Sequence, residues 1–291
     1  MNILTVLARY GTAQYADAEA RIDDLFARQL PGVGRFTVVV ENQHDGDPDE
    51  PAVIEARPDR VLLAGDNRSY EFSAFDRAVA FMGERLDQYD LIHFATSAFH
   101  TLYVAYLERF TTPLVAAIGQ RPVAVGHIDC YNEPVTLRGC VSQHWIRSGF
   151  FMLPPREVRL LGRFADLPDG APFFSGRAKA PFRQDAPLSA AYQRYILDWL
   201  TGRDIGQGVE WHSSFGLTAA TLPAFERKAR SIMTEQWLGI RLRAAGCALV
   251  DVTWLSAQLR GTSAERLNWR TPWRQQLAGR DRDAIVVPPT V

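Results

Sequence analysis

The 291-residue sequence contains only three cysteines, and they form no pairwise motif. Cys130 and Cys140 are too far apart for a CxxC element, and Cys247 lies far along the chain. No further ligands stand at zinc spacing, so the sequence argues against a structural zinc site. Three idle thiols of this kind are typical of a protein in a reducing compartment.

Long apolar runs and an excess of one charge are also missing. No uninterrupted apolar stretch is long enough to cross a bilayer. Residues 1–10 are apolar but lack a basic leader and a small-residue cleavage site, which favours a first strand over a signal peptide. The formal net charge of −1 supplies no global cationic field for nucleic acid. These absences predict a cytoplasmic protein, attached at most to a membrane surface.

Three glycine-rich signatures are absent as well. The sequence has no GxGxxG run and no GxxxxGK[ST] run, which argues against a dehydrogenase and a P-loop nucleotidase. It also has no GxSxG elbow, which argues against a hydrolase with a serine nucleophile.

Strand patterns alternate with helical patterns through the first half of the chain. This alternation predicts a Rossmann-like, mostly parallel sheet flanked by helices, and hence an α/β fold. Expected strands are 2–7, 36–40, 60–64, 90–95, 122–125, 141–153 and 247–252. Expected helices are 13–30, 72–86, 102–110, 188–200 (N-capped by Ser189) and 223–245, with loops at 44–50 and 168–187. We expect one domain, 1–252, followed by a C-terminal helical extension, 253–291.

The most informative segment is 62–76, where a strand pattern gives way to a polar turn that opens a helix. At such junctions in open α/β sheets small ligands bind, and the helix N-terminus adds amide donors and a positive dipole end. Asp66 and Asn67 also fit an Asx turn with a helix cap. Glu71 and Asp76 also fit stabilising carboxylates near the start of a helix.

Several segments, in order along the chain, resemble a bacterial family of GT-A-like glycosyltransferases. Its members act in O-antigen and other surface-polysaccharide (lipopolysaccharide) biosynthesis and are related to rhamnan-synthesis enzymes. The matching segments are 65–67, 70–75, 90–99, 145–153, 188–192 and 228–242. The likeness implies a GT-A-type fold and transfer of a sugar from a nucleotide-sugar donor to a glycan or lipid-linked acceptor.

The resemblance assigns roles to residues of this sequence. At the end of the fourth expected strand, where relatives carry an acidic motif, this chain has Ala95-Thr96-Ser97 without a carboxylate. Magnesium and manganese prefer carboxylate oxygens, so a divalent metal cofactor is doubtful. Cations and helix N-termini would then neutralise the diphosphate. The expected donor-binding residues are Arg9, Asp66, Asn67, Glu71, Thr96, Ser97, Lys228 and Arg230, with Arg68 as a further cation. Thr96 and Ser97 equally fit a helix cap.

The expected catalytic residues are Asp129, Glu235 and His127. A carboxylate or imidazole base assists attack by an acceptor hydroxyl. For His127 and Asp129 a satisfied loop network is the alternative, and for Glu235 a solvated helix surface. Trp145 and Ser148 are expected to bind the acceptor, Trp145 by stacking on a sugar face, although a core tryptophan explains Trp145 as well.

The C-terminal segment 267–274 mixes tryptophan with arginine. It fits contact with anionic lipid headgroups, and it equally fits a docked terminal helix or an oligomer contact. Two rival functions stay open: a catalytically inactive nucleotide- or carbohydrate-binding protein of the same fold, and a hydrolase that uses His127 and Asp129.

Overall fold

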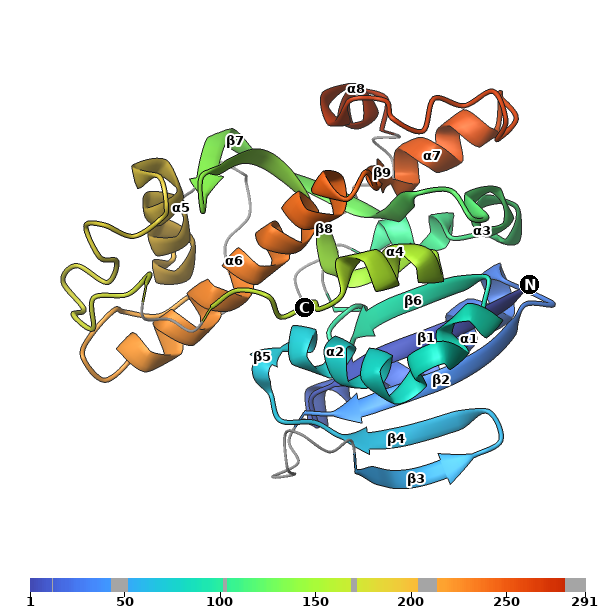
Figure 1. The fold of residues 1–291 in the computed structure, drawn as a ribbon, viewed down its shortest axis with the longest axis horizontal. Helices are drawn as coiled ribbons and strands as arrows, with labels where there is room; N and C mark the ends of the chain where they lie inside the picture. The colour runs from blue at the N-terminus through green and yellow to red at the C-terminus, as the bar shows by residue number, and fades with distance from the viewer. Residues whose placement is uncertain (12, 43–51, 102–103, 169–171, 204–213, 281–291) are drawn as a thin grey trace. The chain divides into compact units, whose positions relative to one another are not determined.

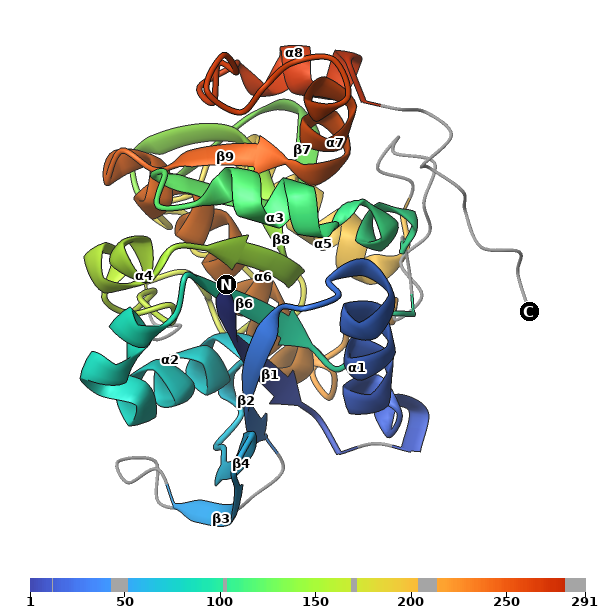
Figure 2. The ribbon, with the colours of Figure 1, turned by 90° about the vertical axis from the view of Figure 1, so that its right-hand side faces the viewer.

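Figures 1 and 2 show the computed structural model, which describes residues 1–11, 13–42, 52–101, 104–168, 172–203 and 214–280. The chain divides into two compact units. The first unit comprises Met1–Ile128, Ile146–Phe164 and Arg241–Val291, and the second comprises Asp129–Trp145 and Ala165–Ile240. The described part of 253–291 groups with the first unit, while the predicted boundary at residue 252 stays a prediction.

Four parallel strands form the centre of the first unit. They lie in the order β4 (Arg60–Ala64), β2 (Gly34–Glu41), β1 (Asn2–Arg9) and β6 (Leu91–Thr96). Val6 of β1 stands opposite Val38 on one side and Phe94 on the other, and all three are buried. A strand covered on both faces needs an apolar run, which is why these strands are visible in the sequence.

In the part of the chain that the structure describes, the sheet has eight strands and is mostly parallel. At one edge β3 (Val53–Arg57) pairs antiparallel with β4. On the other side β8 (Cys140–Leu153) pairs antiparallel with β6, and β7 (Val123–Leu137) and β9 (Ala248–Asp251) follow as a parallel pair. This mixed α/β sheet with flanking helices confirms the predicted α/β fold class, while its GT-A type stays a prediction.

Helices cover both faces of the parallel strands. Figure 2 shows α1 (Ala18–Gln29) and α2 (Glu71–Met82) on opposite sides of β1 and β2. The predicted helix 13–30 is divided, because a 3-10 turn (Ala13–Tyr15) precedes α1. Of the predicted helix 102–110, residues 102–103 lie outside the described residues and Ala105–Arg109 form a 3-10 turn. The remaining helices of the first unit are α3 (Thr112–Ile118), α4 (Pro155–Leu161), α7 (Val252–Leu259) and α8 (Trp273–Ala278).

The edge strand β9 is closed by a side chain from α8. Gln276 accepts a hydrogen bond from the Asp251 N–H (2.7 Å) and donates one to the Leu249 carbonyl (3.1 Å), as a neighbouring strand would. Arg280 pairs with the fully buried Asp251 carboxylate at 2.7 Å. An exposed strand edge invites pairing with another chain, so this cover protects the sheet. It also ties the C-terminal segment to the first unit.

The second unit contains α5 (Ala190–Thr201), most of α6 (Leu222–Ala244) and the outer parts of β7 and β8. Ser189 caps α5 by accepting a hydrogen bond from the Tyr192 N–H at 3.2 Å, as predicted. A separate core of buried side chains holds the unit together, including Tyr131, Trp145, Phe173, Tyr192, Ile196, Phe225 and Met233. Within the described residues, no helix is long and apolar enough to cross a membrane.

Candidate functional site

The carboxyl ends of the four parallel strands meet at one edge of the first unit. Backbone hydrogen bonds join the segments that follow these strands. The Asn42 N–H donates to the Arg9 carbonyl (2.8 Å), and the Gly65 N–H donates to the Glu41 carbonyl (2.8 Å). The Ser97 N–H donates to the Ala8 carbonyl (2.9 Å). Residues that are distant in the sequence therefore lie together where α/β sheets bind ligands.

The turn after β4 is built around Asp66. Its Oδ1 accepts a hydrogen bond from the Arg68 N–H at 3.0 Å, which makes the Asx turn expected as the structural alternative. Its Oδ2 lies 3.8 Å from both the Arg68 and the Arg77 guanidinium groups. Asn67 adopts a φ of 52°, a conformation that asparagine tolerates better than most residues. The turn holds one carboxylate, half-buried, beside the exposed cation of Arg68.

Asn42, which the sequence reasoning missed, holds this turn in place. Its side-chain amide donates to the Tyr70 carbonyl at 3.0 Å and to Asn67 Oδ1 at 3.4 Å, and only 6% of the residue is exposed. A Cβ at Gly65 would lie 2.5 Å from Asn42 Oδ1, so only glycine fits there. The available signal was the position of Asn42, one residue beyond a β-branched strand.

The start of α2 brings Glu71 and Ser148 together. The Ser148 hydroxyl, from β8, donates to Glu71 Oε1 at 2.7 Å. The N-cap residue Tyr70 has a φ of 51°, and its side chain makes no capping hydrogen bond to α2. A non-glycine residue held at positive φ costs energy, and such residues cluster at functional sites. Glu71 was predicted from the sequence to bind the donor and Ser148 to bind the acceptor, and these roles stay predictions.

Asp76, one turn further along α2, has a structural partner. Its Oδ1 accepts a hydrogen bond from the Phe164 N–H at 2.5 Å, and its Oδ2 lies 3.8 Å from the Arg163 guanidinium. The carboxylate therefore anchors the chain that follows α4.

Thr96 and Ser97 end β6 at the same edge. Ser97 is 3% exposed, and its hydroxyl accepts a hydrogen bond from the Tyr10 N–H at 3.1 Å. Ser97 thus links the ends of β1 and β6. Thr96 is half-buried, and a Cβ placed on Gly149 would lie 4.0 Å from its hydroxyl oxygen. Thr96 therefore lies next to the strand that supplies Ser148.

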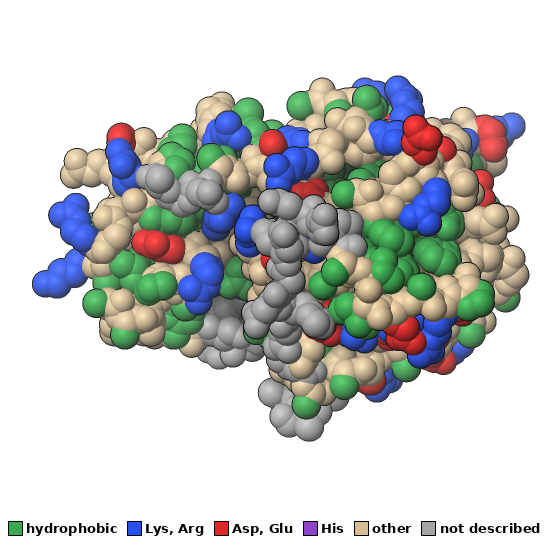
Figure 3. Space-filling view, turned by 60° about the horizontal axis from the view of Figure 1, so that its bottom comes forward, with side chains coloured by type: hydrophobic (Ala, Val, Ile, Leu, Met, Phe, Trp, Pro, Cys, Tyr) green, Lys and Arg blue, Asp and Glu red, His purple; other side chains and the backbone are tan. Residues whose placement is uncertain are grey.

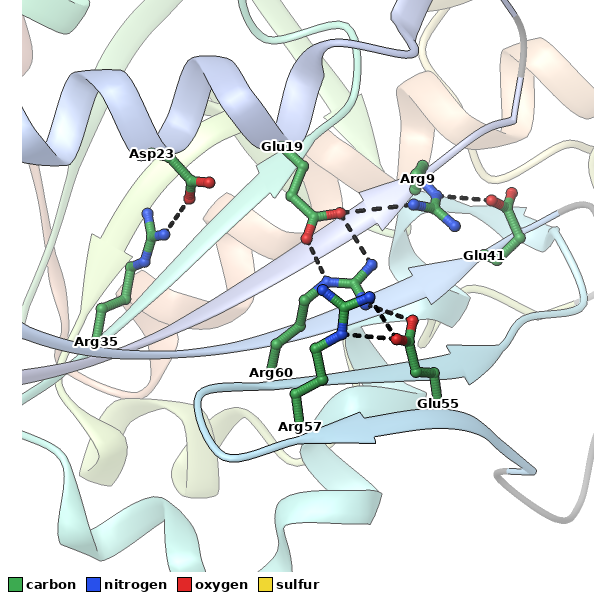
Figure 4. A network of polar contacts seen from close by, with 8 residues as sticks. All are labelled: Arg9, Glu19, Asp23, Arg35, Glu41, Glu55, Arg57 and Arg60. Atoms are coloured by element: carbon green, nitrogen blue, oxygen red, sulfur yellow. Dashed lines mark hydrogen bonds and ion pairs between the residues drawn. The ribbon is translucent and has the colours of Figure 1, made fainter.

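Arg9 belongs to a network of ion pairs on the α1 side of the sheet (Figure 4). Its guanidinium lies 2.7 Å from a Glu41 carboxylate oxygen and 3.5 Å from one of Glu19. Glu19 also binds Arg60, which reaches Glu55 at 3.1 Å. A donor phosphate would compete with two carboxylates for Arg9, so its predicted donor role stays a prediction with a clear obstacle.

The described residues do not suit a cation held by the protein alone. Nowhere in the described ranges do three or more His, Cys, Asp or Glu side chains gather in a metal-binding arrangement. At the end of β6 the oxygens are the hydroxyls of Thr96 and Ser97, and hard cations prefer carboxylates. We therefore derive no chemical step through a metal.

His127 lies in the first unit, at the end of the inner part of β7. It is half-buried, and its ring centroid lies 5.0 Å from that of Tyr106. The N–H of its neighbour Ile128 donates to the Asp251 carboxylate at 3.1 Å, and the Ile128 carbonyl accepts a hydrogen bond from Arg280. The backbone beside His127 is therefore held on both sides.

The other predicted site residues lie in the second unit: Asp129, Trp145, Lys228, Arg230 and Glu235. Trp145 is 4% exposed, and its ring centroid lies 4.6 Å from that of Tyr131. The tryptophan packs into the core of this unit, as its alternative interpretation held. Glu235 is half-buried in α6 and acts electrostatically on the buried Tyr131 and Tyr192. The roles of these residues stay predictions.

Charge on the surface is mixed. On the face that Figure 3 presents, Lys and Arg side chains stand among Asp and Glu side chains, in keeping with the net charge of −1.

The C-terminal tryptophans Trp269 and Trp273 make contacts within the chain. The Trp269 indole donates to the Ala264 carbonyl at 2.9 Å and has the Arg121 guanidinium 5.1 Å from its ring centre. Arg274 lies over Trp273 at 4.6 Å.

Comparisons with known proteins identify no family for this chain. No family model matches the chain, and no curated protein matches it. Among solved structures, a mannosyltransferase from Pyrobaculum calidifontis in complex with GDP-Man and Mn²⁺ is similar at 13% sequence identity and a TM-score of 0.35. The match covers 95% of this chain and 84% of that one. A likeness this distant carries no argument about activity.

Proposed function

We propose that this chain is a glycosyltransferase that moves a sugar from a nucleotide-sugar donor to a glycan acceptor in bacterial surface-polysaccharide biosynthesis. One observation carries the proposal. Donor residues predicted from separate segments of the sequence (Asp66 and Asn67, Glu71, Thr96 and Ser97) lie at one edge of the parallel strands, joined by backbone hydrogen bonds and the Glu71–Ser148 contact. The family resemblance of these same segments supplies the reaction class.

Donor binding at this edge follows from the groups present. Carboxylate and amide oxygens accept hydrogen bonds from ribose or sugar hydroxyls, which suits Asp66 and Asn67. A diphosphate carries negative charge, which the positive dipole end at the N-terminus of α2 and the exposed Arg68 guanidinium favour. The hydrogen bond from Ser148 orients the Glu71 carboxylate, which we propose accepts a hydrogen bond from a donor hydroxyl.

The chemical step breaks the bond between the sugar's anomeric carbon and the diphosphate and forms a bond to an acceptor hydroxyl oxygen. The acceptor proton passes to a base, and the nucleoside diphosphate leaves. Positive charge from Arg68 and the helix N-terminus would stabilise the leaving group. Asp129, Glu235 and His127 are the proposed bases. We also propose that the protein acts at the cytoplasmic face of the inner membrane and contacts lipid headgroups through residues 267–274.

The test is turnover across a panel of nucleotide sugars, with and without added Mg²⁺ or Mn²⁺, measured as release of the nucleoside diphosphate. We expect turnover with one donor class, lowered at least tenfold in Asp66→Asn and in Glu71→Gln. Glu84→Gln is the matched control, because Glu84 is exposed beyond the opposite end of α2. Binding without turnover would favour an inactive nucleotide-binding protein. Absence of both would overturn the proposal.

A further inference from the structure

A hollow in the second unit, remote in sequence from the strand-end segments, has the composition of a sugar-binding site. Its volume is about 200 Å³, and it lies between the outer part of β7 and α5, which Figure 1 shows beside each other. The two elements are fixed locally: the Ser189 N–H donates to the Thr136 carbonyl at 3.0 Å, and the Arg138 N–H donates to the Pro187 carbonyl at 2.7 Å. These two hydrogen bonds hold β7 to the segment that begins α5, so the elements that line the hollow are fixed to each other.

Aromatic and aliphatic side chains form part of its lining. Tyr131 and Tyr195 contact each other edge to face, with ring centroids 4.0 Å apart, and Val135 also lines the hollow. Tyr131 is buried and Tyr195 is half-buried, so Tyr195 supplies the more accessible ring. A tyrosine ring at the wall of a hollow offers its negative face to the C–H groups of a pyranose.

Polar groups on both elements complete the lining. Glu133 of β7 and Arg194 of α5 pair at 3.0 Å across the hollow's wall, and Asn132 and Asp198 supply further oxygens and N–H donors. Asp198 lies 3.5 Å from the Arg203 guanidinium, so positive and negative groups balance here. Planar carboxylate, amide and guanidinium groups hydrogen-bond pairs of vicinal hydroxyls. A balanced charge favours an uncharged ligand over a phosphate or a cation.

We infer that this hollow binds one uncharged hexose ring of a glycan, with Tyr195 against the ring face and Asp198 and Arg194 on its hydroxyls. That the glycan is the acceptor of a transfer reaction rests on the proposed function, whereas binding of the sugar does not. The volume fits a single ring, so the site would hold one residue of a longer chain.

The test is saturation-transfer NMR and titration with a panel of methyl hexosides and hexose disaccharides, with tetramethylammonium and inorganic phosphate as competing probes. We expect one hexoside class to bind, and Tyr195→Ala and Asp198→Asn to weaken its binding at least tenfold. Arg194→Ala is compared with Arg183→Ala, because Arg183 is also exposed and pairs with an acid, Asp185, at 2.7 Å. The Arg183 variant should bind as the unmodified protein does.

Two kinds of result separate this inference from the proposed function. Hexoside binding that is lost in the Tyr195 variant, in a protein that binds no nucleotide, would leave the hollow's assignment standing and remove the transferase. Nucleotide binding together with hexoside binding that all three hollow variants leave unchanged would overturn the hollow's assignment alone. Preference for tetramethylammonium or phosphate over every hexoside would also overturn it.

Discussion

His93 allows a quantitative test of the first unit's core. Its ring is fully buried in β6, between Phe26 and Phe150, with ring centroids 5.6 and 4.1 Å away, and Thr5 Oγ1 lies 3.2 Å from its Nδ1. Burial, with a smaller contribution from Arg35, lowers the pKa of His93 from 6.5 to about 3. As the pH falls, His93 takes up a proton in the unfolded chain before it does so in the folded protein. Its contribution to the free energy of unfolding is therefore fully present above pH 6.5 and is lost progressively towards pH 3.

The size of the effect follows from the two pKa values. Between pH 7 and pH 5, His93 alone should lower the free energy of unfolding by about 2 kcal/mol. The assay is urea unfolding followed by circular dichroism at both pH values, for the unmodified protein and for His93→Gln, which does not titrate. His144→Gln is the control, because His144 is only half-buried. Equal pH dependence in the unmodified and His93→Gln proteins would refute the reasoning.

Three further predictions concern packing. Arg280→Met should lower the free energy of unfolding by about 3 kcal/mol in urea titrations, because it leaves the buried Asp251 carboxylate without its cation. A loss below about 0.5 kcal/mol would show that the C-terminal segment is not docked against Asp251. Ser148→Ala should lower the free energy of unfolding by about 2 kcal/mol in the same assay, because it removes the hydrogen bond to Glu71. That loss should vanish in a Glu71→Ala background, which has no acceptor for the Ser148 hydroxyl, if the bond is its cause. Burial raises the pKa of the Cys247 thiol, so a thiol reagent at pH 8 should leave Cys247 unmodified until the protein unfolds. Peptide mass spectrometry measures the modification, and rapid labelling of Cys247 in the folded protein would contradict the burial of this thiol.

Local patterns were sufficient for the central strands and the long helices. The apolar runs of β1, β2, β4 and β6 predict buried parallel strands, and the spacing in α6 predicts its length to within a few residues. The short elements β3, β5 (Arg68–Tyr70), α3 and α4 escaped prediction, because their form depends on the sheet they pack against. Apart from the first residue of α7, the helices α7 and α8 lie within the helical extension predicted for 253–291, although their bounds were not predicted.

The hairpin of β7 and β8 shows a second limit. The sequence predicts that the strand ends at residue 125, but β7 continues to Leu137 through polar residues and Pro134. Its turn is made by Arg138 and Gly139, with φ values of 52° and 77°. A turn with two positive φ values is usually signalled by Asn-Gly or Asp-Gly, so Arg-Gly gave only a weak signal. The second unit was therefore not foreseen.

The candidate site could be predicted only in part, because some of its residues follow recognisable strands and others meet through tertiary contacts. Asp66, Asn67, Thr96 and Ser97 follow apolar strands directly, so chain order alone brings them to one edge. The ion pairs of Arg9 join residues on separate strands and α1, and no spacing in the sequence reveals them. The hollow beside Tyr195 likewise arises from two elements distant in the chain.

The most direct test of the central claim is an amide chemical-shift map of the isotope-labelled protein titrated with UDP, GDP, dTDP and CMP. The account predicts that one of these ligands shifts the amides of residues 65–71, 96–97 and 148–149 together, at the carboxyl edge of the parallel strands. Shifts confined to other parts of the protein, or none with any of the four, would contradict it.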